Sequence, residues 1–249
     1  MADQWEFYPC QMGDHTAFVF VNVSIGDRLT ELARTGQVLI RVQLKHPRDD
    51  GLTTTGEFDA LSQLEDGFTN YCETASADMV GRITVGGFRD FAVYAEDAQT
   101  VSHGLRTIAE DEHGYEVECL VRDDPEFEVY WKHLYPTPVD WQLIQNRQLV
   151  EQLEEQGDDC ESSRRIDHWV HFDSAEHRDQ FEKRVLSEGF AVEVLLEAGD
   201  EDLRHGLHIY RDDTPDRAQI NDVTIMLFRL AEEFGGEYDG WETQVTQAE

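Results

Sequence analysis

Two prolines in the segment Tyr135-Pro136-Thr137-Pro138 divide the chain into two stretches, and each stretch contains a similar order of strands and helices. Proline lacks a backbone N–H and restricts the residue before it, so no regular element is expected to run through this segment. We therefore predict two α+β domains, residues 1–137 and 138–249. Each is long enough to bury a hydrophobic core.

The first stretch predicts the order strand, helix, strand, strand, helix, strand. Alternating apolar residues indicate strands, and apolar residues three or four apart indicate helices. Gly86-Gly87 separates two short apolar runs and is typical of a hairpin, whose turn needs positive φ. Asp124-Pro125 is expected to open a further short helix. The main elements are strands at 37–45, 79–85, 88–95 and 115–121 and helices at 58–71 and 101–108.

Two segments precede this series. Residues 5–9 resemble a short strand or extended arm. Residues 17–25 are almost continuously apolar and β-branched, which predicts a strand buried on both faces. The first domain is therefore expected to have the βαββαβ order of a ferredoxin-like sandwich, with an extra N-terminal strand or two.

The second stretch opens with a predicted helix at 139–156. A strand at 166–172 follows, and its alternating side chains indicate one buried face. Ser174 is expected to cap the next helix and Gly189 to end it. Two strands, at 190–196 and 206–211, are separated by an acidic loop.

The last helix and strand lie within residues 214–245. Thr214 is a suitable N-cap and Pro215 suits the first helical turn. Apolar residues then recur at helical spacing until Gly235-Gly236, where glycine permits the left-handed conformation that ends helices. The second domain thus has the βαββαβ order behind one leading helix. The predicted fold class is α+β, with two ferredoxin-like sandwich domains.

The chain is strongly acidic, with 20 basic and 53 acidic residues and a net charge of −33. Such a field repels phosphates, so direct binding of nucleic acid is not expected, whereas partners with a basic surface are attracted. Solubility in high salt explains the same composition. The N-terminus lacks the pattern of a signal peptide, and no apolar run is long enough for a membrane span. A cytoplasmic protein is expected.

No catalytic or metal motif emerges from the sequence. The four cysteines are widely separated. His168 and His171 should point to opposite faces of one strand, as should His205 and His208. Paired carboxylates carry little information among 53 acids, and no phosphate loop is present. We therefore expect no catalytic residue, cofactor or metal site.

Asp239-Gly240-Trp241 has two interpretations. It is either a strand interrupted by a turn or bulge, with Trp241 packed on the sheet, or an aromatic-bearing strand that forms a partner surface. Arg164-Arg165, an adjacent basic pair, is interpreted as the solvated start of a strand. The candidate partner-binding residues are Tyr238, Asp239, Gly240, Trp241, Asp167 and His168.

Residues 139–246 resemble the regulator of ribonuclease E activity B (RraB) family. The resemblance rests on 145–156, on Ile166-Asp167-His168, on 174–190 and above all on 237–241 (Glu-Tyr-Asp-Gly-Trp). It implies a ferredoxin-like fold and a protein that inhibits ribonuclease E by binding it, without catalysis.

Residues 1 to about 135 resemble a bacterial family known as domain of unknown function 695. The similar features are 5–9 (Trp-Glu-Phe-Tyr-Pro), 19–22, 47–51, 81–89 and 123–126 with Tyr130. This resemblance implies no activity.

Three functional hypotheses follow. The first is a non-enzymatic cytoplasmic regulator that binds a basic protein partner, such as ribonuclease E. The alternative is a small-molecule-binding module or enzyme with a site between the two domains. The third is an oligomerisation protein whose sheets pair at their edges.

Overall fold

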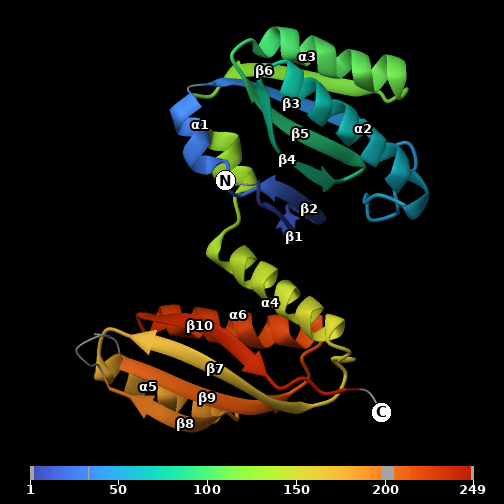
Figure 1. Ribbon diagram of the computed structural model, residues 1–249. Helices are drawn as coiled ribbons and strands as arrows, with labels where there is room; N and C mark the ends of the chain where they lie inside the picture. Colours follow the sequence, from blue (N-terminus) through green and yellow to red (C-terminus); the bar gives the residue numbers. More distant parts are fainter. Residues whose placement is uncertain (1–2, 33, 198–204, 248–249) are drawn as a thin grey trace. The chain divides into compact units, whose positions relative to one another are not determined.

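The computed structural model describes residues 3–32, 34–197 and 205–247. The chain forms two compact units, Met1–Asp140 and Trp141–Glu249, each built on one antiparallel sheet (Figure 1). The sheets have six and four strands, and helices pack on each. The predicted class, α+β with two ferredoxin-like domains, is confirmed.

The six-stranded sheet has the order β1-β2-β4-β5-β3-β6. Its last four strands have the ferredoxin-like arrangement, and the β1–β2 hairpin extends the sheet beyond β4. Gly86 and Gly87 have φ of +57° and +88° and form the predicted β4–β5 turn. The elements are β1 (Trp5–Met12), β2 (His15–Asn22), α1 (Gly26–Leu32), β3 (Gly36–Gln43), α2 (Thr55–Thr74), β4 (Ala77–Val85), β5 (Phe88–Ala95), α3 (Ala98–Thr107) with the π-helical turn η1 (Ile108–Glu112), β6 (Val117–Asp123) and η2 (Tyr130–Leu134).

Both faces of this sheet are packed against helices. Helices α2 and α3 cover one face (Figure 1), where Val38, Ile40 and Val42 of β3 are fully buried in the main core. Helix α1 and η2 lie against the other face. There Tyr8 donates a hydrogen bond from Oη to the carbonyl of Leu134, at 2.8 Å.

A buried network centred on Asp124 holds η2. The carboxylate accepts hydrogen bonds from Tyr94 Oη at 2.7 Å and Gln37 Nε2 at 3.2 Å. It also accepts from the backbone N–H groups of Glu128 and Val129, at 2.9 and 3.3 Å. Asp124 therefore opens the short helix, as predicted, and also ties it to the sheet.

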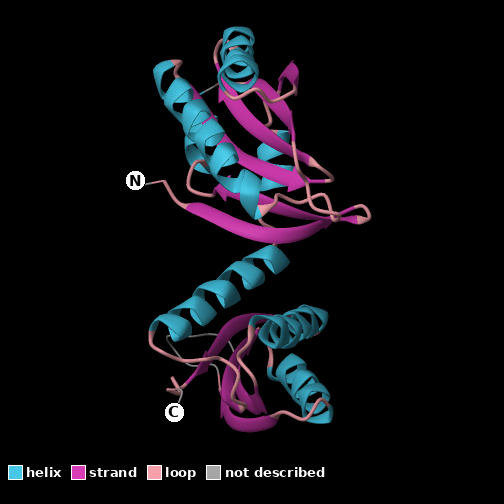
Figure 2. Cartoon of the chain, turned by 90° about the vertical axis from the view of Figure 1, so that its right-hand side faces the viewer, coloured by secondary structure: helices cyan, strands magenta, loops and turns pink. Residues whose placement is uncertain are grey.

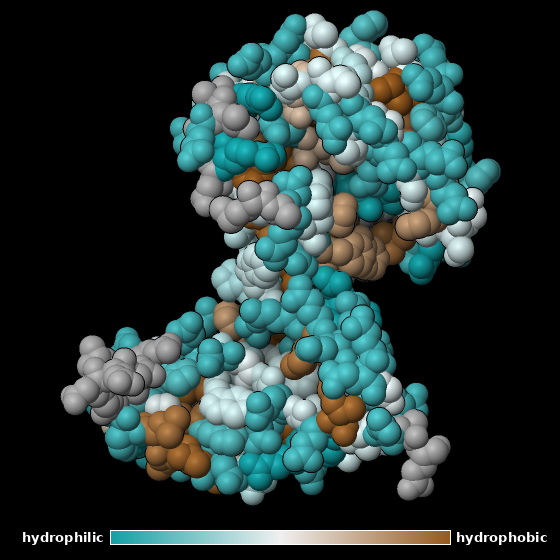
Figure 3. All heavy atoms as spheres, viewed as in Figure 1, coloured by the Kyte–Doolittle hydropathy of each residue, from teal (hydrophilic) through white to brown (hydrophobic). Residues whose placement is uncertain are grey.

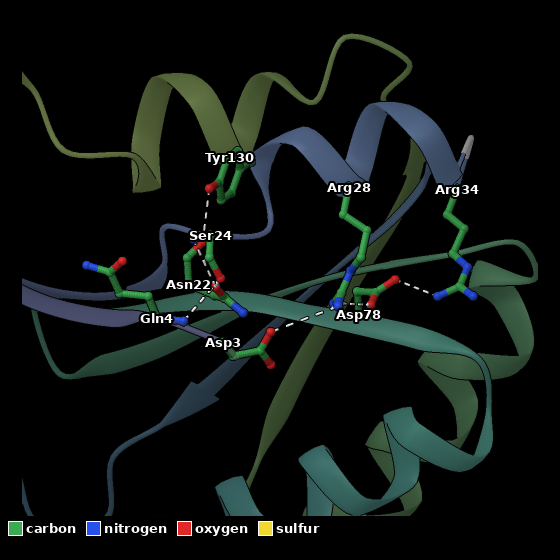
Figure 4. Close-up of polar contacts among 8 residues, drawn as sticks. All are labelled: Asp3, Gln4, Asn22, Ser24, Arg28, Arg34, Asp78 and Tyr130. Atoms are coloured by element: carbon green, nitrogen blue, oxygen red, sulfur yellow. Dashed lines mark hydrogen bonds and ion pairs between the residues drawn. The ribbon is translucent and has the colours of Figure 1, made fainter. Parts of the chain in front are cut away.

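Helix α1 was not predicted, and two arginines, Arg28 on the helix and Arg34 two residues after its end, attach this segment to the sheet. Arg28 and Arg34 both pair with the Asp78 carboxylate of β4 (Figure 4). The strand predicted over 17–25 is present as β2, but the prediction that both of its faces are buried is wrong. Strand β2 ends at Asn22, and Phe18 and Phe20 are only half-buried because the β1–β2 hairpin extends beyond α2 and α3.

The four-stranded sheet has the ferredoxin-like order β10-β7-β9-β8. Helices α5 and α6 cover one of its faces (Figure 2), and the core between them contains Phe172, Phe181 and Leu227. Its elements are α4 (Pro138–Glu155), β7 (Arg164–Phe172), α5 (Ala175–Ser187), β8 (Ala191–Leu196), β9 (His205–Asp213), α6 (Arg217–Glu233) and β10 (Gly236–Thr243). The predicted acidic loop between β8 and β9 lies largely outside the described residues.

Two helix termini follow the sequence and one does not. Ser174 caps α5 by accepting from the N–H of His177, as predicted. Gly235 ends α6 with φ of +66°. The N-cap of α6 is Asp216, however, and not Thr214. One oxygen of the Asp216 carboxylate, Oδ1, accepts from the N–H groups of Ala218 and Gln219, each at 3.0 Å.

Candidate functional site

The six candidate residues divide between the two faces of the four-stranded sheet. The register places Asp167 and Gly240 on the face opposite α5 and α6, which we call the open face. His168 and Tyr238 point into the core. Trp241 faces the helix side, because a bulge at Asp239 shifts the alternation of β10 after Tyr238. The bulge predicted at Asp239-Gly240 is therefore present.

His168 and Tyr238 form a buried pair. The His168 ring is fully buried, and its Nδ1 lies 2.9 Å from Tyr238 Oη. Burial, with Arg211 adding to it, lowers the pKa of His168 to about 3. Burial, with Asp239 adding to it, raises the pKa of Tyr238 well above 10. Both groups are neutral near pH 7 and inaccessible to a partner, so they stabilise the β7–β10 pairing.

Trp241 attaches the leading helix α4 to the rest of its domain. Its indole Nε1 donates to Asn146 Oδ1 at 2.9 Å. The buried Asn146 amide in turn donates to Asn221 Oδ1 at 2.9 Å and Thr224 Oγ1 at 2.7 Å, both on α6. These contacts favour the interpretation in which Trp241 packs within its own domain over the one in which it forms a partner surface.

The open face bears a row of residues across all four strands, with aromatic rings only on its two central strands, and we call this row the aromatic stripe. Val194, His208, Trp169 and Gly240 are neighbours in the strand register. The Trp169 and His208 rings are stacked, with centroids 4.5 Å apart and planes 18° apart. At Gly240 an added Cβ would meet no atom within 4 Å. The stripe therefore ends beside Trp169 in open space. This face is turned to the viewer in Figure 1.

A network of charges fixes the side chains next to the stripe. Asp167 accepts hydrogen bonds from Arg165, at 2.6 Å from Nη2, and lies 2.7 Å from His208 Nε2. Arg165 also pairs with Glu193 at 3.0 Å and lies over the Tyr210 ring, 3.8 Å from its centroid. Burial alone would raise the pKa of Asp167, but the bonds from Arg165 and His208 outweigh it and lower the pKa.

Arg164-Arg165 is therefore not simply solvated, contrary to the sequence interpretation. Arg164 pairs with the buried carboxylate of Asp158, at 2.6 Å, because its side chain turns toward the helix side of the strand. Arg165 is held on the open face by Asp167 and Glu193. Each guanidinium meets its own carboxylates, which the sequence pattern did not reveal.

Carboxylates outnumber guanidinium groups on the open face. Asp239 lies 3.5 Å from His171 Nε2 at the rim, and its side chain is mostly exposed. Figure 3 shows hydrophilic residues surrounding paler ones of intermediate hydropathy on this side of the domain. The acidic positions on or beside this face are Asp167, Glu193, Glu237, Asp239 and Glu242, with Arg165 opposing them.

Metal-binding geometry is not found in the described part of the chain, where no three His, Cys, Asp or Glu side chains gather. His168 and His171 do lie on opposite faces of β7, as the strand period predicts. No helix among the described residues has the length and apolarity needed to span a bilayer.

The fold and this surface define a class of protein: two ferredoxin-like domains, of which the second presents an acidic, aromatic sheet face. Two family models match the chain. The chain belongs to the family of unknown function DUF695, whose model matches residues 3–135. Residues 143–243 match the model of a second family, the regulator of ribonuclease activity B.

Comparison with individual proteins adds little. No curated protein matches the chain. Among solved structures, an unknown protein from Galdieria sulphuraria is 14% identical, with a TM-score of 0.23 over 82% of this chain and 96% of that chain. A putative glycine cleavage system transcriptional repressor is 7% identical, with a TM-score of 0.27 over 84% and 98%. At such scores neither likeness defines the fold.

Proposed function

We propose that this protein is a non-enzymatic cytoplasmic regulator whose C-terminal domain binds and inhibits a ribonuclease E-type enzyme. The observation that carries the proposal is the match of residues 143–243 to the regulator of ribonuclease activity B family. The acidic, aromatic open face of the same domain supports it, because it offers a surface for a basic protein partner.

The open face has the composition of a binding surface. Tryptophan and tyrosine contribute much of the energy at protein interfaces, and Trp169 and Tyr210 are both partly exposed. Their positions are fixed by stacking on His208 and by the Arg165 guanidinium. A rigid surface loses little conformational entropy when a partner binds.

The candidate residues then have different roles in the proposed complex. Asp167, Asp239 and Gly240 lie on or beside the open face and contact the partner. His168, Tyr238 and Trp241 act from behind, since they hold β7, β10 and α4 in place. Their substitution should therefore change stability first and binding second.

The charge determines which component of an RNA-degrading system is bound. A net charge of −33 repels RNA, so inhibition works through the enzyme and not through its substrate. The same charge accelerates encounter with a basic surface, and salt weakens this effect.

The test is cleavage of a defined RNA by purified ribonuclease E, with and without the full-length protein, over a salt series. We expect inhibition that saturates at a fixed stoichiometry and weakens as salt rises. Trp169→Ala should reduce inhibition by about tenfold, as expected for an interface anchor. Leu120→Ala, on the exposed N-terminal sheet edge, is the control. Absence of inhibition at every salt concentration, with the protein folded, would refute the proposal.

A further inference from the structure

The two sheets have four edge strands, and three of them carry features that prevent pairing with another chain. Strand β1 contains Pro9, which cannot donate a hydrogen bond, and the inward-pointing Glu6. Strand β6 has exposed charges on both sides of Leu120. Strand β10 has the Asp239-Gly240 bulge and exposed acids. Proline, charges and bulges are the usual protection of sheet edges.

Strand β8 lacks this protection over its second half. Its sequence is Ala-Val-Glu-Val-Leu-Leu, with no proline and a single charge, that of Glu193. Val194, Leu195 and Leu196 are 41%, 43% and 44% exposed, although all three are large and apolar. Figure 3 shows a hydrophobic patch at the lower left of the C-terminal domain, over the end of β8 in Figure 1.

The backbone of this segment is regular enough to accept another strand. A bulge lies between Val192 and Val194, but from Val194 to Leu196 the strand pairs with β9 in continuous register. Val194 pairs with His208 and therefore continues the aromatic stripe of the open face. Leu196 packs closely over Gly206 on the same face. A strand added here would extend both the sheet and the stripe.

We propose that β8 binds an extended, basic segment of a partner protein as a fifth strand of the sheet. This inference rests on the proposed function and names the surface and the kind of segment that the regulator would recognise. The Leu196 carbonyl already accepts a hydrogen bond from Arg178 Nη1 at 3.2 Å. Main-chain hydrogen bonds to the edge before that carbonyl would supply affinity, as in other cases of strand addition. Apolar side chains of the segment would cover Val194 and Leu196.

Charge determines that the segment is basic and that a second copy is not the occupant. Residues 141–249 contain 10 basic and 27 acidic residues, a net charge of 10 − 27 = −17. Glu193 and Glu197 flank the apolar residues and keep exposed carboxylates although each already has an arginine partner. Two copies brought edge to edge would repel, whereas lysine or arginine at alternate positions would meet these acids.

The probe is a ten-residue peptide of alternating lysine and valine, blocked at both ends and labelled for fluorescence anisotropy with the full-length protein. A glutamate–valine peptide and a lysine–valine peptide with a central proline are the comparison probes. We expect binding of the first peptide alone, and amide hydrogen exchange slowed at residues 191–196. Equal binding of the proline peptide, or protection confined to β10, would overturn the proposal.

The double variant Val194→Lys/Leu196→Lys should weaken binding at least about tenfold. Glu233→Lys, at an exposed position of α6, changes the net charge by the same amount and should change binding less than about threefold. Equal losses in the two variants would show general electrostatic attraction and overturn the proposal. If circular dichroism shows the double variant unfolded, Val194→Lys alone replaces it. If the wild type forms a dimer that is lost only in the double variant, the occupant of β8 is a second copy of the chain, and the proposal of a basic partner is overturned.

The ribonuclease assay separates this inference from the proposed function. If the wild type inhibits the ribonuclease and Val194→Lys/Leu196→Lys inhibits it equally, the proposed regulatory function stands, but β8 is not the surface that inhibits. If the peptide binds at β8 but the wild type does not inhibit the ribonuclease, the strand-addition site stands and the ribonuclease is not its partner.

Discussion

The two domains share one strand arrangement but use the second face of the sheet differently. In the N-terminal domain α1 and η2 cover part of that face, and buried polar groups such as Gln37, Tyr94 and Asp124 hold η2 there. In the C-terminal domain no helix covers the equivalent face in the described residues, and Arg165 and His208 both bind Asp167 on it. The same fold thus serves internal packing in one case and presents a surface in the other.

The largest expected effect comes from breaking the covered face of the N-terminal domain. Asp124→Ala removes four hydrogen bonds from a buried carboxylate and leaves Tyr94 and Gln37 without this acceptor. We expect a loss of about 3 kcal/mol in the stability of that domain. Region-resolved hydrogen exchange on the full chain should show faster exchange in η2 and β3. Asp123→Ala, at an exposed neighbour, should cost less than about 0.5 kcal/mol.

The buried histidine should make the C-terminal domain sensitive to acid. The pKa of His168 in the folded state is lowered to about 3, whereas an unfolded histidine titrates near 6.5. The unfolded state therefore binds the proton first, and stability present above about pH 6.5 is lost as pH falls toward 3. Between pH 7.5 and pH 5 this residue should lower the free energy of unfolding of the domain by about 2 kcal/mol.

The measurement is chemical denaturation at several pH values, comparing wild type with His168→Gln. The difference between their stabilities should shrink as pH falls, because glutamine does not titrate. His15→Gln, at an exposed histidine, should follow the wild-type pH dependence. If the difference in unfolding free energy between wild type and His168→Gln does not change with pH, His168 is not held neutral in the folded state.

Two tryptophans of the C-terminal domain should separate stability from binding. Trp241→Phe removes the indole N–H that Asn146 Oδ1 accepts in a mostly buried site, so we expect a loss of about 1.5 kcal/mol in stability. Trp169→Phe keeps an aromatic ring on the open face and should leave stability within about 0.5 kcal/mol while weakening partner binding. Thermal unfolding and the ribonuclease assay measure the two effects. Equal stability of both variants would contradict this assignment of roles.

The sequence predicted the order of elements because burial imposes periods of two and near four on apolar residues, and these periods are visible over most of the chain. Short elements carry too few apolar residues for this, which is why α1 was not predicted. The cap of α6 was misplaced because Thr214 and Asp216 are both good capping residues. Only the backbone path selects between them.

The candidate site was harder to predict because a single bulge changes which face a side chain occupies. Tyr238 and Trp241 are three residues apart and would lie on opposite faces of a regular strand. The bulge at Asp239 places both on the helix side, while Gly240 reaches the open face. Trp169, which carries the aromatic stripe, was missed because an isolated tryptophan in an alternating strand has no distinguishing pattern. Its stacking partner His208 lies on a different strand.

Two glycines in the two domains offer the finest comparison, since a Cβ added at either would meet no atom within 4 Å. They differ strongly in backbone conformation. Gly13, in the β1–β2 turn, has φ of +62°, a left-handed region that other residues occupy at modest cost, whereas Gly240 has φ of +129°, where almost only glycine is found. Gly240→Ala should therefore cost about 1 kcal/mol more than Gly13→Ala in denaturant unfolding. Because the space beside Gly240 is empty, a difference of this size would measure backbone strain alone. If the costs were equal, the bulge would relax toward regular pairing, Trp241 would turn away from Asn146, and faster exchange of α4 amides would reveal it.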